Sequence, residues 1–264
     1  MMKTITITAY NRPRNFQLLL DSLRDQILPL DEYKLYIKID PGGSQIETIK
    51  AMAEAVDFVE TEVRCDGNHL GLNRATYASL QRVFEEGDSD FNVYLEEDFL
   101  LSPDAFHLAE WYIKNDQFLQ SQCRADGAAL SVALYGLVNL YTRNNASREE
   151  VFMAWGGGMW GFVVSRPQWI RYVKDGWLSS GQSWDAALAE WIRRDTCSMR
   201  TFPDVSRISN TGFRGEHSDP ASLSERLRYF EFNQDKVEYQ FRYVGLRSQA
   251  LRQQHKEEAV RRPR

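Results

Sequence analysis

The chain has 264 residues, of which 43% are hydrophobic and 26% are charged, a composition typical of a globular protein with one large domain. Its formal net charge of −5 argues against a general nucleic-acid binder. Three widely spaced cysteines form neither a disulfide framework nor a metal-ligand pattern, which favours a reducing compartment. The sequence shows no signal peptide and no apolar run long enough to cross a membrane, so we expect a cytoplasmic protein without a membrane span.

The charge is distributed unevenly along the chain. Residues 222–264 contain 10 Lys+Arg and 6 Asp+Glu, a local charge of +4, which leaves −9 for the rest. We expect residues 221–264 to form a helical extension. Its arginines, concentrated between Arg242 and Arg264, can contact phosphate, although a solvated helix is the commoner role of such a segment.

Strand and helix patterns alternate through the first hundred residues. Period-two apolar patterns predict strands at residues 3–10, 33–40 and 61–65. Helical spacing predicts intervening helices that start near residue 15, after residue 44 and after residue 70, the first closed by Pro29 and the others ending near residues 56 and 86. Such a series of alternating strands and helices predicts a mostly parallel, doubly wound α/β sheet.

The most informative stretch is a fourth strand, 91–95, which runs directly into Glu96, Glu97 and Asp98. In an open α/β sheet, ligands bind at the carboxyl ends of strands. Three adjacent carboxylates repel one another unless a cation neutralises them, and oxygen ligands suit Mg²⁺ or Mn²⁺ better than zinc. The alternative is a solvated acidic turn before the next helix, predicted at 104–122.

The other strand ends also carry residues suited to a nucleotide. Arg12 lies just before a helix N-terminus, where it can meet a diphosphate. Asp40 can accept from a base N–H, while Asn68 and Arg74 open a helix that can close around a ligand. Each residue also has an ordinary explanation, as a solvated arginine, a turn cap or a loop residue. The agreement of four strand ends favours a nucleotide site.

The second half begins with a predicted strand at 128–135 and later contains a glycine run between Trp155 and Trp160 that leads into another strand. Glycines such as Gly157 and Gly158 allow close approach of backbone to a ligand, and indoles offer flat walls that stack on sugars. The run lacks the lysine and the spacing of a phosphate-binding P-loop. A tight turn with both tryptophans in the core is the alternative.

Further along, residues 183–194 have helical spacing, with Asp185 in the first turn and Glu190 in the second. A strand near residues 202–207 is followed by a glycine-containing loop that holds His217. A lone histidine in a loop is usually structural or exposed, and His217 is retained as a second candidate metal ligand.

Together these stretches resemble inverting sugar-nucleotide glycosyltransferases of the GT-A fold, with the nearest likeness to N-acetylglucosaminyltransferase I and its protein O-mannose-linked relatives. The resemblance covers about a third of the chain, in the order of the family's motifs. Residues 5–13, which include Ala9, Asn11 and Arg12, are similar to the family's opening strand and nucleotide-contacting turn. The acidic triplet and Pro103–Phe106 are similar to the family's acidic triplet and the helix after it. Residues 157–161 with Trp169 are similar to the segment that lines the donor pocket, and residues 190–194 with 203–207 are similar to the base-bearing helix and the strand after it.

The resemblance implies roles for the acids. Asp98 would bind the divalent metal, Glu97 would face ribose or the donor sugar, and Glu96 would face the donor sugar hydroxyls. Asp40 would read uracil. One departure is the middle acid, which is Glu97 where the family usually has Asp; another is the missing anchor and stem, which favours a bacterial or phage origin over a Golgi enzyme.

The implied function is metal-dependent transfer of a sugar, with inversion, from a nucleotide sugar (a UDP-sugar first) to an acceptor hydroxyl. Residues 1–220 would form the catalytic domain, with a nucleotide-binding half, 1–100, and an acceptor half, 101–220. The acceptor is open between a glycan, a lipid-linked saccharide and a modified base in phage DNA. Nucleotidyl transfer is disfavoured because the turn after the first strand lacks glycine, and a non-catalytic sugar-binding module is the remaining alternative.

Two acids compete for the role of catalytic base. The resemblance favours Glu190, because the family places an acid directly before Trp191. The helix geometry favours Asp185, whose position in the first turn keeps it ionised, whereas Glu190 has Arg193 and Arg194 as surface ion-pair partners. Five helical residues separate the two side chains by about 140°, so only one can face the acceptor. We predict Asp185, with Glu190 as the alternative.

Overall fold

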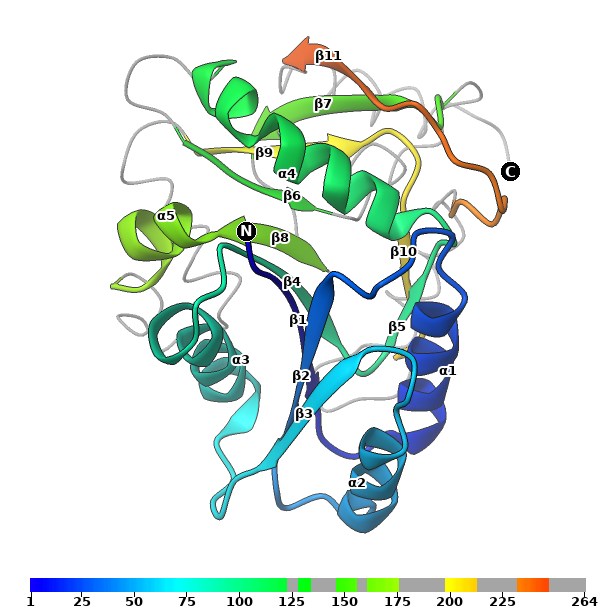
Figure 1. Ribbon diagram of the computed structural model, residues 1–264, viewed down its shortest axis with the longest axis vertical. Coiled ribbons are helices and arrows are strands. Elements are labelled where there is room, and N and C mark those ends of the chain that lie inside the picture. Colours follow the sequence, from blue (N-terminus) through cyan, green and yellow to red (C-terminus); the bar gives the residue numbers. More distant parts are fainter. Residues whose placement is uncertain (123–127, 134–145, 156–160, 176–197, 213–231, 247–264) are drawn as a thin grey trace, which may run out of the picture.

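The computed structural model describes residues 1–122, 128–133, 146–155, 161–175, 198–212 and 232–246, which form one large mixed sheet with helices on both faces (Figure 1). The elements of the first half are β1 (Lys3–Ala9), α1 (Pro13–Arg24), β2 (Tyr33–Ile39), α2 (Ile46–Glu54), β3 (Glu60–Cys65), α3 (Gly71–Gln81) and β4 (Phe91–Glu96). The later elements are β5 (Phe99–Leu101), α4 (Ala105–Gln122), β6 (Ala128–Ala133), β7 (Glu150–Trp155), β8 (Phe162–Ser165), α5 (Arg166–Gln168), β9 (Ser198–Pro203), β10 (Ile208–Asn210) and β11 (Arg242–Leu246).

The strands of the described residues form a nine-stranded sheet in the order β11-β7-β9-β6-β8-β4-β1-β2-β3, and a two-stranded sheet of β5 and β10. The first four strands are parallel to one another, which confirms the predicted βαβ series. Strand β8 is antiparallel to both of its neighbours, β4 and β6, and joins the parallel half to the rest of the sheet. The predicted mostly parallel α/β architecture is therefore confirmed.

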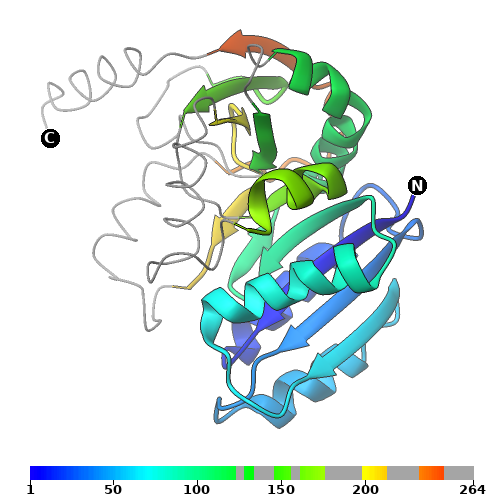
Figure 2. The ribbon, with the colours of Figure 1, turned by 90° about the vertical axis from the view of Figure 1, so that its left-hand side faces the viewer.

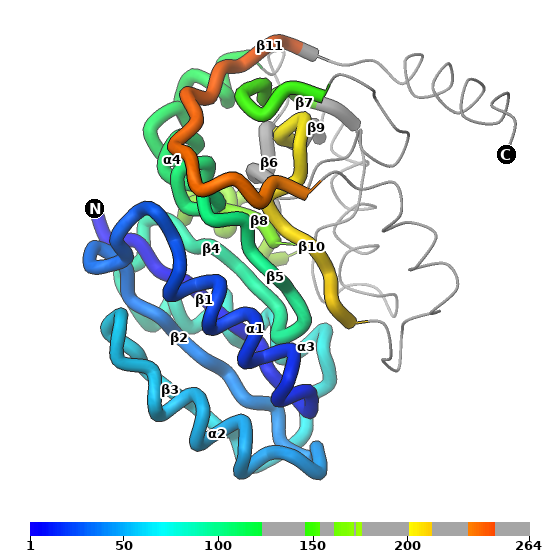
Figure 3. The backbone as a smooth tube through the Cα atoms, turned by 90° about the vertical axis from the view of Figure 1, so that its right-hand side faces the viewer, coloured from blue at the N-terminus to red at the C-terminus, as the bar shows by residue number. Residues whose placement is uncertain are grey.

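Strand β1 lies inside the sheet, and its alternating threonines and isoleucines lie on opposite faces of the sheet. Ile5 and Ile7 are fully buried in the core that includes the apolar residues of α1 and α2. On the other face, beneath α3, Thr4 and Thr6 donate to the side-chain oxygen of Asn92 at 2.9 and 2.7 Å. Helices α1 and α2 thus cover one face of the parallel strands and α3 covers the opposite face (Figures 2 and 3).

The helix predictions hold with shifted ends. Helix α1 begins at Pro13 and ends at Arg24, before the predicted stop at Pro29, while α3 continues through a π-helical turn, Arg82–Glu86, to the predicted end. None of the helices in the described part of the chain combines the length and apolar character needed to cross a bilayer.

The helical prediction for the C-terminal region is wrong at residues 242–246, which form strand β11 at the edge of the sheet, parallel to β7. The physical reason lies in tertiary packing. The ring of Phe241 packs against Trp111, and that of Tyr243 against Phe118, both on α4. Packing of alternate aromatic residues against α4 outweighs the local helical preference of the sequence. The division into a catalytic domain and an extension remains a prediction.

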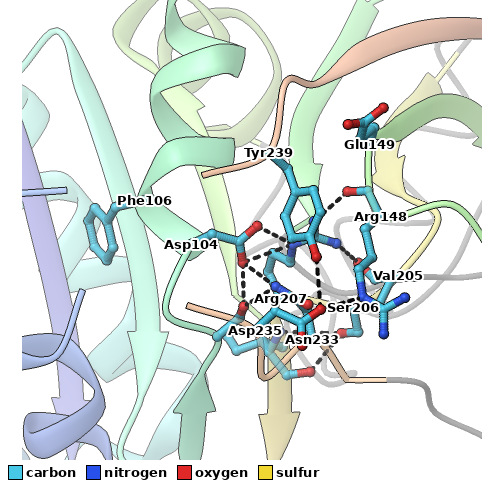
Figure 4. A network of polar contacts seen from close by, with 12 residues as sticks. Asp104, Phe106, Arg148, Glu149, Val205, Ser206, Arg207, Asn233, Asp235 and Tyr239 are labelled. Carbon is cyan, nitrogen blue, oxygen red and sulfur yellow. Dashed lines mark hydrogen bonds and ion pairs between the residues drawn. The ribbon is translucent and has the colours of Figure 1, made fainter. Parts of the chain in front are cut away.

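A buried ion pair connects the smaller sheet to the rest of the fold (Figure 4). Asp104, just before α4, accepts from Nε of Arg207 at 2.9 and 3.1 Å, and both side chains are fully buried. Burial lowers the pKa of Arg207, and Asp104 opposes that shift. Asn233 also donates to Asp104, at 2.8 Å, so the pair joins three distant segments of the chain.

We predict that Arg207→Met destabilises the protein by about 3–5 kcal/mol, because it leaves the Asp104 carboxylate buried without its counter-charge. The measurement is urea unfolding followed by circular dichroism. The control is Arg242→Ala, whose surface pair with Glu150 leaves the Arg242 side chain 66% exposed, and whose loss should have little effect. Equal stability of Arg207→Met and wild type would show that the pair is dispensable.

Candidate functional site at the carboxyl ends of β1, β2 and β4

Three neighbouring parallel strands end level with one another, and the turns that follow them form the candidate site. The register pairs Thr8 of β1 with Glu96 of β4, and Ala9 of β1 with Ile39 of β2. The main chain continues these pairings past the strand ends, because the N–H of Glu97 donates to Thr8 O at 3.0 Å and that of Asp40 donates to Ala9 O at 2.9 Å. The predicted nucleotide-contacting turn therefore lies beside the predicted acidic triplet.

The carboxylate of Glu97 holds the turn after β1. It accepts from the backbone N–H groups of Tyr10 at 2.7 Å, Asn11 at 3.3 Å and Arg12 at 3.4 Å. Burial raises the pKa of Glu97, and the three N–H donors oppose part of that shift. In this structure, the side chain of Glu97 orders the turn by binding the turn's main-chain N–H groups. A contact between Glu97 and ribose or the donor sugar remains a prediction.

Asp98 meets the side chain of Arg12. Nη1 of Arg12 forms an ion pair with Oδ2 of Asp98, while the amide of Asn210 lies 3.4 Å from Oδ1. The Asp98 side chain is 11% exposed and that of Arg12 is 28% exposed. Burial raises the pKa of Asp98, and the adjacent guanidinium opposes the shift. The structure thus brings together the predicted metal ligand and the predicted diphosphate ligand.

The segment Asn210–Gly212, to which no sequence motif assigned a role, completes the surroundings of Asp98. The backbone oxygen of Asp98 accepts from the N–H of Thr211 at 2.7 Å and from its hydroxyl at 2.9 Å. A Cβ at Gly212 would lie 2.1 Å from Oδ2 of Asp98 and 2.6 Å from Nη1 of Arg12. Only glycine leaves room for the ion pair, and the glycine loop after β10 was the one sequence signal that pointed to this position.

The loop after β2 is fixed to the turn after β1. The side-chain oxygen of Asn11 accepts from the N–H of Gln45 at 2.9 Å. A Cβ at Gly43 would lie 2.6 Å from the carbonyl oxygen of Tyr10, so the two backbones approach closely. Asn11 is therefore a bridge between the two loops in this structure.

Asp40, directly after β2, binds the loop that precedes α3. Its carboxylate accepts from the N–H groups of Leu70 and Gly71, both at 2.8 Å, and Nδ1 of His69 lies 3.0 Å from Oδ2. The imidazole of His69 also packs against the ring of Tyr10, with 5.2 Å between centroids. Asp40 orders the loop before α3, and its reading of uracil remains a prediction.

The remaining predicted residues lie at the margin of the site or outside the described ranges. Glu96 is half-buried at the end of β4, with the hydroxyl of Tyr94 3.5 Å from Oε1. Asn68 and Arg74 are exposed. The positions that lie outside the described residues are Gly157, Gly158, Trp160, Asp185, Glu190 and His217.

The residues around Asp98 are compatible with one divalent cation, under a condition. The described ranges contain no group of three or more His, Cys, Asp or Glu residues that could hold a metal. Mg²⁺, however, is usually held by one or two carboxylates together with substrate phosphates and water. Asp98 can supply that share if Arg12, which pairs with its Oδ2, leaves the carboxylate.

Comparison with known proteins identifies the fold. No protein-family model matches the chain, and a search of curated proteins found no match. Among solved structures, S. aureus TarS 1-349 superposes with a TM-score of 0.56 at 13% sequence identity, covering 86% of this chain and 71% of that one. The complex of TarS 1-349 with UDP-GlcNAc gives a TM-score of 0.55 at 14% identity, covering 86% of this chain and 65% of that one.

The mannosyltransferase PcManGT from Pyrobaculum calidifontis, in complex with GDP-Man and Mn²⁺, gives a TM-score of 0.52 at 13% identity. That comparison covers 100% of this chain and 65% of the mannosyltransferase. The chain has the GT-A glycosyltransferase fold predicted from its motifs. The likeness to N-acetylglucosaminyltransferase I in particular remains a prediction.

The position of Gly212 gives a test of the site. Gly212→Ala should displace the Arg12–Asp98 pair and destabilise the protein by about 1–3 kcal/mol, because the added methyl group overlaps both side chains. Urea unfolding measures the effect. Gly67→Ala is the matched control, because a Cβ at Gly67 meets no atom within 4 Å. If the two variants are equally stable, the packing of Gly212 against the pair is not as tight as the structure indicates.

Proposed function

We propose that this protein is a metal-dependent, inverting glycosyltransferase that moves a sugar from a nucleotide sugar, in the first instance a UDP-sugar, to an acceptor hydroxyl. The observation that carries the proposal is the meeting of Arg12 and Asp98 at the ends of β1 and β4. This pairing occurs in a fold shared with transferases solved with UDP-GlcNAc and with GDP-Man. The acceptor class we favour is a glycan or a lipid-linked saccharide.

In this proposal, the turns after β1, β2 and β3 bind the nucleotide. Arg12 binds the diphosphate, as a guanidinium suits phosphate oxygens. Asp40 and Glu97 hold the surrounding backbone through the N–H groups that they accept, so they shape the nucleotide site even where they do not touch the ligand. Glu96, together with Gly157, Gly158 and Trp160, is assigned to the donor sugar.

A divalent cation, Mn²⁺ or Mg²⁺, would be held by Asp98, with His217 as a second candidate ligand. When bound, such a cation offsets the negative charge that develops on the leaving nucleoside diphosphate. A carboxylate on the opposite side, Asp185 or Glu190, takes the proton of the acceptor hydroxyl as that hydroxyl attacks the anomeric carbon. A single displacement of this kind inverts the configuration of the sugar.

The first test is a donor screen. The protein is incubated with UDP-glucose, UDP-galactose, UDP-GlcNAc and GDP-mannose in the presence of Mn²⁺, and mass spectrometry detects the released nucleoside diphosphate. We expect slow hydrolysis of one donor, with Asp98→Ala lowering the rate by about 10²-fold or more because the cation site is lost. The control is Asp57→Ala, which removes a surface partner of Arg24. Hydrolysis that survives both EDTA and Asp98→Ala contradicts the metal assignment.

The second test distinguishes the two candidate bases. Asp185→Asn should lower turnover by about 10²–10⁴-fold, as expected for the loss of a general base, while nucleotide affinity stays unchanged. Glu190→Gln serves as the matched variant on the same predicted helix. An active Asp185→Asn together with an inactive Glu190→Gln would assign the base to Glu190. If both variants keep full turnover, neither acid is the base.

A further inference from the structure

Arg12 and a divalent cation require the same carboxylate. Oδ2 of Asp98 is paired with Nη1 of Arg12, and the described residues offer that carboxylate no other positively charged partner. Asp98 carries a single negative charge and is largely buried, so it cannot neutralise a guanidinium and a divalent cation together. Binding of a cation at Asp98 therefore requires that Arg12 move away.

The surroundings show which part of the pair can move. The backbone of Asp98 is held by Thr211, through two hydrogen bonds at 2.7 and 2.9 Å, and Gly212 packs against the carboxylate. The main chain of Arg12 is also fixed, because its N–H donates to Glu97 at 3.4 Å and its carbonyl accepts from Phe16 at 2.9 Å. The free element is the long side chain of Arg12, the more exposed partner of the pair.

We propose that Arg12 is the resident counter-ion of Asp98 and that it transfers to the diphosphate of the nucleotide when a divalent cation takes its place. This inference rests on the proposed nucleotide-sugar function and adds an exchange between two cations at one carboxylate. In this exchange, the guanidinium of Arg12 leaves the carboxylate of Asp98 and binds the diphosphate of the nucleotide. Because arginine binds both carboxylates and phosphates strongly, its charge is compensated before and after the exchange.

The exchange couples the two ligands. A cation that binds alone must displace Arg12 while nothing else receives the guanidinium, so it binds weakly. A nucleotide that binds alone meets an arginine already engaged by Asp98. When both bind, each removes the obstacle to the other, and linkage requires that the two affinities rise by the same factor. Removing the guanidinium should tighten binding of the cation alone and reduce this coupling.

The experiment measures Mn²⁺ affinity, from the electron paramagnetic resonance signal of free Mn²⁺, with and without UDP. Arg12→Gln retains a side-chain donor for Asp98 but removes the charge. We expect this variant to bind Mn²⁺ alone about 10-fold more tightly than wild type, and the enhancement by UDP to fall by a similar factor. The control, Arg24→Ala, removes an arginine at the C-terminal end of α1, the helix that follows Arg12, where its surface pair is with Asp57.

Asp98→Asn separates failure of this inference from failure of the proposed function. If Asp98→Asn binds Mn²⁺ as wild type does, the metal assignment itself is wrong. If Asp98→Asn loses Mn²⁺ while Arg12→Gln binds Mn²⁺ alone no more tightly than wild type, the cation site stands and the exchange is overturned. If Arg12→Gln does not fold, the wild-type measurement alone still tests the exchange. Equal Mn²⁺ affinities of the wild type with and without UDP would overturn it.

Discussion

The side chain of Glu97 accepts three backbone N–H groups, and the geometry of the candidate site depends on this interaction. Because β1 and β4 are adjacent and parallel, the turn after β4 lies beside the end of β1, where the N–H of Glu97 donates to the carbonyl oxygen of Thr8. Glu97 uses that proximity to fix Tyr10, Asn11 and Arg12. Asp98 is the next residue, so the backbone that holds the turn also sets where Arg12 meets a carboxylate. Loss of these three hydrogen bonds would leave the turn after β1 without its side-chain support, and Arg12 would no longer be positioned to pair with Asp98.

The opposite side of Asp98 depends on a second constraint, the buried pair of Asp104 and Arg207. Arg207 directly precedes β10, whose antiparallel pairing with β5 carries Asn210 to Phe99, next to Asp98. The ion pair is therefore structural, and it lies one short strand away from the candidate site. Buried pairs of this kind cost desolvation energy, and their best-attested benefit is to specify one arrangement. Here that arrangement is the register that places Gly212 against Asp98.

The parts of the fold that the sequence predicted are those set by local patterns. Alternating residues in β1 and β2, and helical spacing in α1 and α4, depend on neighbours a few positions away. The contact between Asn210 and Asp98 spans 112 positions, and no local pattern encodes it. Strand β11 was missed for the same reason, since its conformation depends on aromatic packing against α4. The acids were found as candidates, but a sequence cannot tell whether a carboxylate at a strand end will accept backbone N–H groups or face a ligand.

The length of Glu97 explains the one departure within the acidic triplet. The family that the sequence resembles usually has Asp at this position, and the side chain of Glu is longer than that of Asp by one methylene group. Here the carboxylate has to reach across from the end of β4 to the N–H groups beyond the end of β1, with the shortest contact at 2.7 Å. A side chain shorter by one methylene would withdraw the oxygens by roughly one carbon–carbon bond, about 1.5 Å, and would leave the N–H groups of Asn11 and Arg12 beyond hydrogen-bonding distance. The longer acid thus suits a residue that organises the turn, whereas the carboxylate of the next residue, Asp98, meets the side chain of Arg12 instead of backbone N–H groups.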